Sequence, residues 1–163
     1  MDESATNDDC NSLNEDNATS KQRTIVLISC STSQKEGLNI AHEHYISPLF
    51  VKSWKFANKI NADEIFILST KHGLLSPYTH IEQYDFSKPI IRWEKWADSI
   101  VNGLKKHGIS ANDKIIILAS DKYCKYLEQS FQLLFPHRFL HIIKPLKNLT
   151  IGSRLKELNK LNK

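Results

Sequence analysis

Three runs of consecutive apolar residues, rich in β-branched side chains, divide the chain: TIVLISC at 24–30, EIFILS at 64–69 and KIIILA at 114–119. Short apolar runs of this kind are typical of strands covered on both faces, as in a parallel sheet. Parallel neighbours cannot be joined by tight hairpins, so the chain between them must cross over, usually through a helix. The runs therefore predict an α/β fold.

The intervening segments have the helical spacing that such crossovers need. Apolar residues recur every three or four positions in four segments, at about 45–60, 90–107, 121–134 and 151–161. A further apolar run, FLHII at 139–143, predicts a last strand. We expect a three-layer α/β domain whose central four-stranded, mainly parallel sheet is flanked by helices on both faces.

The charge distribution separates the first 20 residues from the rest. They contain six of the 18 acids and none of the 22 Lys and Arg, and Asn, Ser and Thr fill most of the remainder. Such a segment buries too little apolar surface to offset the entropy lost on ordering. We expect a disordered acidic tail at 1–22 and a single α/β domain at 23–163.

The charge of residues 21–163 favours polyanionic partners, nucleic acid first among them. This part keeps all 22 bases and 12 acids, a net charge of +10. Bases are densest between Arg138 and Lys163, where seven stand against Glu157 alone. The alternative interpretation of that run is a solvated helix face with a frayed end.

Cysteine usage predicts a reducing compartment. Cys10, Cys30 and Cys124 form no disulfide framework, and no stretch approaches the 18 apolar residues of a membrane span. The first residues also lack the basic start and apolar core of a signal peptide. We expect a cytoplasmic protein that does not contact a membrane.

Each apolar run ends in a polar cluster, and parallel strands place these ends along one edge of a sheet. The first cluster begins at Cys30 and extends to Lys35, with small hydrogen-bonding side chains but no phosphate-binding glycines. Its amides and hydroxyls suit a base edge, a sugar or a phosphate. For Cys30 a small buried thiol is favoured over a covalent nucleophile.

The second cluster, Ser69 to Gly73, combines a hydroxyl, a cation and an imidazole with a glycine that permits a positive φ. Asp85 lies in the long connection that follows, between Lys71 and Pro89. Its carboxylate is suited to orient water, act as a base or stabilise a developing cation, and the alternative is a turn acid. His42 and His44 match no metal spacing, so we expect no metal and no cofactor.

The order of these motifs resembles a known family. LISCS with Lys35, YISPLF at 45–50, ILSTKHGLL at 67–75, Tyr84-Asp85 and LAS with Tyr123 follow one another as in YaaA-like domains of bacteria and phages. The pattern is also similar to the glycosylase-like domain of archaeosine synthase. The resemblance implies a fold of uracil-DNA-glycosylase type. The family's motif positions fall on Cys30, Ser31, Lys35, Tyr45, Ser47, Ser69, Lys71, His72, Gly73, Tyr84, Asp85, Tyr123 and Gly152.

The resemblance implies a base-glycosylase-like hydrolase that acts on a nucleic acid, a nucleotide or a nucleobase. Asp85 would then orient water, and Lys71 and His72 would stabilise the leaving base or a phosphate. The remaining positions other than Gly152 would bind substrate, with Tyr45 or Tyr84 stacking on the base and Ser31 and Ser69 hydrogen-bonding its edge. Two alternatives are a non-catalytic nucleic-acid-binding module and a small-nucleotide sensor on the same fold. The chain lacks the water-activating segment of true uracil glycosylases, so uracil excision itself is not implied.

Overall fold

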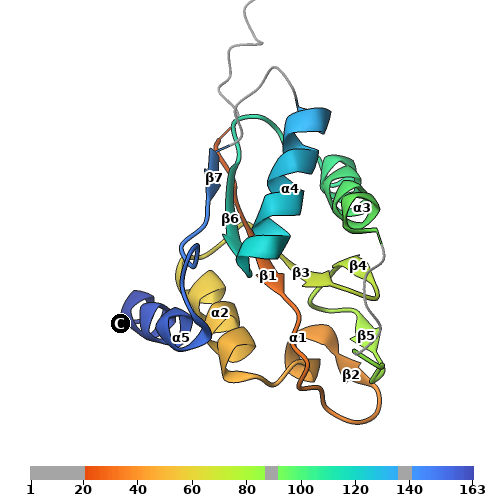
Figure 1. Ribbon diagram of the computed structural model, residues 1–163, viewed down its shortest axis with the longest axis vertical. Helices are drawn as coiled ribbons and strands as arrows, with labels where there is room; N and C mark the ends of the chain where they lie inside the picture. The colour runs from red at the N-terminus through yellow and green to blue at the C-terminus, as the bar shows by residue number, and fades with distance from the viewer. Residues whose placement is uncertain (1–20, 87–91, 136–140) are drawn as a thin grey trace, which may run out of the picture.

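The computed structural model describes residues 21–86, 92–135 and 141–163. A five-stranded sheet runs through its centre in the order β4-β3-β1-β6-β7 (Figure 1). The strands are β1 (Thr24–Ser29), β3 (Glu64–Ser69), β4 (Gly73–Leu75), β6 (Lys114–Leu118) and β7 (His141–Ile143). All neighbours are parallel except β4, which is antiparallel to β3. The predicted three-layer α/β fold with a mainly parallel sheet is confirmed.

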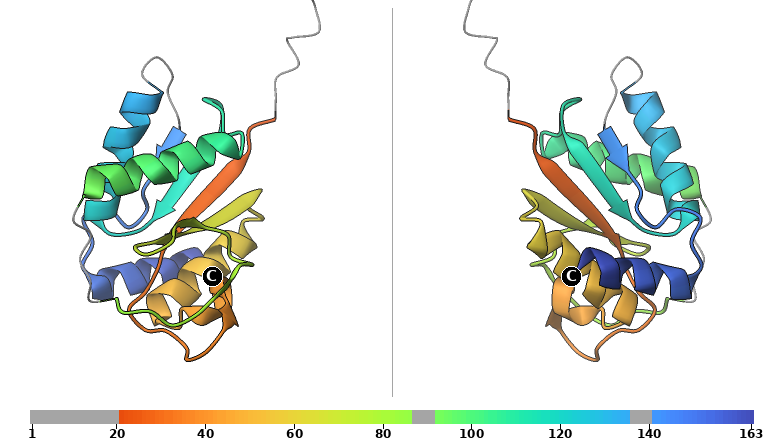
Figure 2. Two further views of the ribbon diagram at one scale, coloured as in Figure 1. Left: turned by 90° about the vertical axis from the view of Figure 1, so that its right-hand side faces the viewer. Right: turned by 90° about the vertical axis from the view of Figure 1, so that its left-hand side faces the viewer.

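Helices cover both faces of the sheet (Figure 2). One face carries α3 (Trp93–Lys106) and α4 (Asp121–Leu134), and the other carries α2 (Pro48–Lys59) and α5 (Ile151–Leu161). Alternate residues of β1 serve the two layers, because successive side chains of a strand point to opposite faces. Ile25 and Leu27 belong to the core under α3 and α4, and Val26 and Ile28 to the core under α2 and α5. Two buried faces explain the unbroken apolar runs.

The fifth strand was not predicted. β4 lies in the segment expected to be a loop, and Gly73, with a φ of +70°, opens it directly after β3. Its Leu74 packs against α3, where a Cβ added to Gly103 would lie 3.0 Å from Leu74 Cδ2. A strand of three residues is too short to show a recognisable periodic pattern in the sequence.

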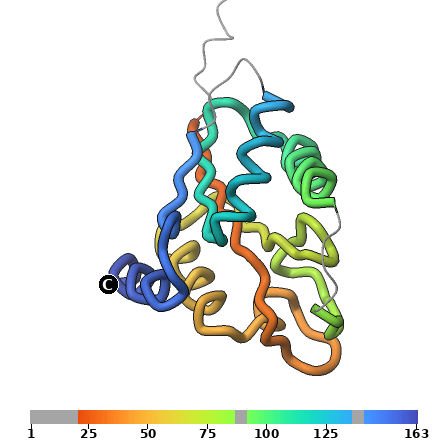
Figure 3. The backbone as a smooth tube through the Cα atoms, viewed as in Figure 1, coloured from red at the N-terminus to blue at the C-terminus, as the bar shows by residue number. Residues whose placement is uncertain are grey.

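A small unit beyond the main sheet was also not predicted from the sequence. It consists of β2 (Asn39–Ile40), the single helical turn α1 (Ala41–His44) and β5 (His80–Ile81). β2 and β5 pair antiparallel, and the Ala41 amide donates to the Thr79 carbonyl at 2.8 Å. Segments 31–45 and 76–86 therefore lie side by side beyond the ends of the strands (Figure 3).

Several helix boundaries agree with the expected ones. Ser47 caps α2 by accepting the Phe50 N–H at 3.2 Å, and Pro48 is its first residue. α4 and α5 have the predicted bounds, whereas α2 begins at residue 48 rather than 45. The first residues of the helix predicted at 90–107 and of the strand predicted at 139–143 lie outside the described residues, as do positions 1–20 of the predicted tail.

The strand order places a topological switch at β1. The chain leaves β1 towards α2 and returns to β3 on one side, and later enters β6 on the other side and leaves towards α4. Loops that follow neighbouring strands β1 and β6 thus diverge to opposite faces of the sheet. Ligands of open α/β sheets bind in the crevice that opens at such a point, outside the carboxyl ends of the strands. The fold therefore directs attention to the end of β1.

Asp113 is the centre of a hydrogen-bond cluster at the end of the sheet that lies opposite the carboxyl end of β1. Its carboxylate accepts the Arg23 N–H at 3.2 Å, the Ser110 N–H at 2.9 Å and the Arg23 guanidinium at 3.1 Å. Burial by itself would raise the pKa of Asp113, but the hydrogen bonds from Ser110 and Arg23 outweigh it and hold the pKa below its usual range.

Asp113→Asn is expected to lower the free energy of unfolding by about 1–3 kcal/mol at neutral pH, because it removes a charged acceptor from three donors. A pKa that is depressed by folding stabilises the protein above the unfolded value of about 4, and the contribution is lost as the pH falls below it. The difference between wild type and variant, measured by urea denaturation, should shrink in acid. The exposed control Glu36→Gln should be as stable as wild type at neutral pH. The same result for Asp113→Asn would contradict this role of Asp113.

Candidate functional site

The ends of three parallel strands meet around the thiol of Cys30. Cys30 follows β1, and the side chains of Thr70, Tyr84 and Tyr123 lie within hydrogen-bonding reach of its sulfur. Thr70 directly follows β3, and Tyr123 lies in the first turn of α4, after β6. The structure thus brings the three polar clusters together at one edge of the sheet.

Tyr84 is the hub of a hydroxyl network at this edge. Its hydroxyl lies 2.8 Å from the Tyr45 hydroxyl and 3.4 Å from Ser69 Oγ. Ser69 Oγ also accepts the backbone N–H groups of Lys71 at 3.2 Å and His72 at 2.9 Å. The fully buried Ser69 therefore fixes both the turn after β3 and the position of the Tyr84 ring.

The backbone of Tyr84 is held by a side chain that the sequence did not single out. The Gln34 amide accepts the Tyr84 N–H at 3.2 Å and donates to the Tyr84 carbonyl at 3.0 Å. This pair fixes the orientation of the amide, so His44 Nε2, 2.8 Å from Gln34 Oε1, must be the donor in that contact. Gln34 stood within a predicted polar cluster, but no local pattern marks a side chain that pairs with backbone fifty residues away.

Burial keeps the groups of this edge uncharged. It raises the pKa values of Cys30, Tyr45, Tyr84 and Tyr123, so the thiol and the three phenols stay protonated. A protonated thiol disfavours Cys30 as a nucleophile.

The two histidines of this region are also shifted towards their uncharged forms. Burial lowers the pKa of His44, with a smaller effect of His72, and burial followed by the charge of Lys71 lowers the pKa of His72. The edge therefore offers neutral donors and acceptors, with Lys71 Nζ 5.4 Å from the centre of the Tyr84 ring.

Two other predicted residues also contribute to this arrangement. Tyr123 reaches Cys30 while its ring packs against Trp93 and Trp96, with centroid separations of 5.3 and 5.1 Å. Asp85, an exposed residue, directly follows the clamped Tyr84, and consecutive Cα atoms are only about 3.8 Å apart. The Gln34 clamp therefore positions the backbone next to Asp85 as well.

The remaining predicted residues lie near this edge in structural roles. Ser31 is buried and its hydroxyl donates to the Ser33 carbonyl at 2.8 Å, and Ser47 caps α2. Gly73 adopts the positive φ anticipated for it. Lys35 is exposed, and its backbone N–H donates to the His44 carbonyl at 2.8 Å.

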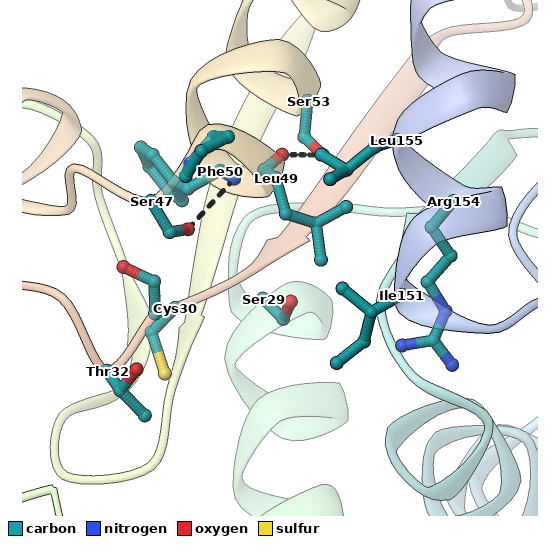
Figure 4. A pocket seen from close by; sticks show the side chains of 12 residues that line it. Ser29, Cys30, Thr32, Ser47, Leu49, Phe50, Ser53, Ile151, Arg154 and Leu155 are labelled. Carbon is teal, nitrogen blue, oxygen red and sulfur yellow. Dashed lines mark hydrogen bonds between the residues drawn. The ribbon is translucent and has the colours of Figure 1, made fainter.

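A pocket of about 330 Å³ adjoins the network, between the end of β1 and the first turns of α2 and α5 (Figure 4). Its volume is at the lower end of the range for small-molecule sites, roughly 300–1,000 Å³. Cys30 belongs to both the network and the pocket wall, and Ser31 and Ser47 also line the pocket. Arg154 of α5 lines it too, a residue that sequence reasoning placed only within a basic run.

Across residues 21–86, 92–135 and 141–163, no helix has the length and apolar character needed to cross a bilayer. Within those ranges, no three His, Cys, Asp or Glu side chains gather as metal ligands would.

Comparison with known proteins assigns the family. A model described as "Family of unknown function (DUF6884)" matches residues 25–160. The chain belongs to this family. The match contains the strand ends, Tyr84, Asp85 and Arg154, so the whole edge described above is part of the DUF6884 domain. No curated protein and no solved structure matches the chain.

His44→Gln is expected to reduce the dependence of stability on pH. The pKa of His44 is lower in the folded protein than its unfolded value of about 6.5, so protonation favours the unfolded chain and stability falls as the pH drops from about 7 to about 5. Removing the imidazole removes this component, which urea denaturation at the two pH values would reveal. A variant that keeps the full wild-type dependence would contradict the assignment, and the exposed His80→Gln is the matched control.

Proposed function

We propose that the protein is an enzyme of N-glycosidase type that acts on a modified base or nucleoside, within a nucleic acid or as a free nucleotide. The observation that supports this best is the uncharged hydrogen-bonding edge around Tyr84, the residue that precedes the exposed Asp85 in the chain. Neutral donors and acceptors suit the edge of a base, and a carboxylate suits the cationic character that develops on the sugar.

The reaction would consume one water for each base released. The bond between C1′ and the base nitrogen breaks with its electron pair leaving on the base, while the sugar gains oxocarbenium character. Water would add to C1′ and lose a proton to Asp85. The departing base nitrogen would take up one proton from solvent, to which Asp85 returns its own, so the step balances. Lys71 and His72 would stabilise the leaving base. His72 N–H is held in the turn that Ser69 fixes, 2.9 Å from Ser69 Oγ.

Recognition of the base would fall chiefly to Tyr84. Tyr45 is only 1% exposed, so it serves by orienting the Tyr84 hydroxyl at 2.8 Å rather than by stacking. The half-buried Tyr84 ring has His72 at its edge, with centroids 5.5 Å apart. Cys30, Ser69 and Thr70 supply polar atoms around it. If the substrate is duplex DNA, the base has to be flipped out first, which costs a few kcal/mol.

Two further observations support recognition of a base and a cytoplasmic site of action. The resemblance of the motifs to YaaA-like domains, and to the glycosylase-like domain of archaeosine synthase, supports a base as the group recognised. Cys30 and Cys124 are free, buried thiols, which favours a cytoplasmic site of action.

Asp85→Asn should lower the rate of base release by roughly 10²–10⁴-fold, because an amide cannot accept the proton from water. Chromatography of bases released from modified DNA, tRNA and free nucleosides measures this, with the exposed Glu82→Gln as the matched control. Release from none of these substrates, or equal rates for wild type and Asp85→Asn, would defeat the proposal.

A nucleic-acid-binding module is the second candidate, favoured by the exposed Lys156 and Lys160 on α5. In that case affinity for nucleic acid would fall steeply with salt, weaken when both lysines are neutralised and ignore Asp85→Asn. A small-nucleotide sensor would instead show thermal stabilisation by nucleotides without affinity for a nucleic-acid strand. The same protein preparations distinguish these outcomes from base release.

A further inference from the structure

The pocket beside the tyrosine network has the chemistry of an anion site. Arg154 is its only charged lining residue among the described residues, and no acid lines it. Hydroxyl groups make up much of the remaining polar wall, from Ser29, Ser31, Thr32, Ser47 and Ser53. A cation surrounded by hydroxyls matches the charge and the acceptor oxygens of a phosphate.

Arg154 has unused hydrogen-bonding capacity. Its Nε is shielded from solvent and, within the described part of the chain, has no acceptor. Buried polar groups of native proteins are nearly always paired, and an unpaired donor on a charged group carries a large desolvation cost. Figure 4 shows the Arg154 side chain beside Ile151 on the pocket wall, across from Leu49 of α2. An anion in the pocket would pair with the terminal nitrogens of the Arg154 guanidinium, and its negative charge would offset the cost of holding the shielded Nε without an acceptor.

Two helix N-termini reinforce the positive potential. α2 has 12 residues and begins at Pro48, and α5 has 11 and begins at Ile151, and both first residues line the pocket. The dipole of each helix is equivalent to roughly half a positive charge at this end.

The pocket also adjoins the edge that we propose to bind a base. Cys30 lies in the pocket wall and interacts with Tyr84 and Tyr123, so the two regions meet at its side chain. The two regions differ in charge: the tyrosine edge is neutral, whereas the pocket carries Arg154. This division matches the two ends of a nucleotide, an uncharged base and a charged phosphate.

We infer that the pocket binds the phosphate group of the substrate and that Arg154 is the residue that pairs with it. The substrate class is therefore a nucleoside phosphate rather than an unphosphorylated nucleoside. The identity of the nucleoside end rests on the proposed function, whereas the phosphate site rests on the pocket itself.

Isothermal titration of the full chain with inorganic phosphate and with nucleoside 5′-monophosphates tests this inference. Wild type should bind both, and Arg154→Gln should weaken each by roughly tenfold to a hundredfold, because a charge-assisted hydrogen-bonding partner is lost. Lys55→Gln, an exposed change on α2 away from the pocket lining, should leave both affinities unchanged. Arg154→Lys keeps the charge without the planar fork and should give an intermediate affinity.

Absence of phosphate binding by wild type, or an equal affinity in Arg154→Gln, would overturn the inference. Circular dichroism melting of each variant shows whether it is folded, and Arg154→Lys provides the comparison if Arg154→Gln unfolds. A 5′-mononucleotide and a short oligonucleotide without a terminal phosphate distinguish a monoester from a strand phosphate, since Arg154 should matter for whichever one occupies the pocket.

The inference and the proposed function can fail separately. Phosphate binding that depends on Arg154, without release of any base, would support the phosphate site and defeat the glycosidase. Base release from unphosphorylated nucleosides, at the same rate in wild type and Arg154→Gln and without phosphate binding, would support the glycosidase and overturn the phosphate site.

Discussion

Burial of β1 on every side is the constraint on which the rest of the structure depends. β3 and β6 occupy its two edges, and helices cover its two faces, so Val26 and Leu27 have no exposed surface. A strand enclosed in this way can meet solvent only at its ends. The polar residues that follow Ser29 therefore lie at an end of the central strand, and the loops after β1 and β6 diverge there to opposite faces of the sheet, as they do at the ligand sites of open α/β sheets.

The sequence was sufficient for the elements with strong periodicity and weak for contacts that depend on tertiary structure. β1, β3, β6 and the helices α4 and α5 followed from apolar runs and helical spacing, because each buries a whole face or stripe. β4 has three residues and lies where a loop was expected, so its pairing with β3 comes from the turn at Gly73 rather than from a pattern. The convergence of the three polar clusters at one edge of the sheet also followed from parallel strand ends.

The parts of the site that were missed share one physical cause. Gln34 forms hydrogen bonds with the backbone of Tyr84. Arg154 lines a pocket together with the end of β1 and the start of α2. Both depend on segments that are remote in sequence and become neighbours only in the fold. In sequence, Arg154 is one of several bases in a positively charged run and cannot be told apart from its neighbours. In the structure its Nε is buried, whereas Lys156 and Lys160 are exposed.

The central claim is that the strand ends, Tyr84 and the Arg154 pocket form one ligand site. Backbone amide chemical shifts of isotopically labelled protein, followed during titration with nucleoside 5′-monophosphates, test it most directly. The largest changes should fall together on Cys30, Thr70, Tyr84 and the first turn of α5. Changes confined to the exposed lysines of α5, or to the opposite end of the sheet around Asp113, would contradict it.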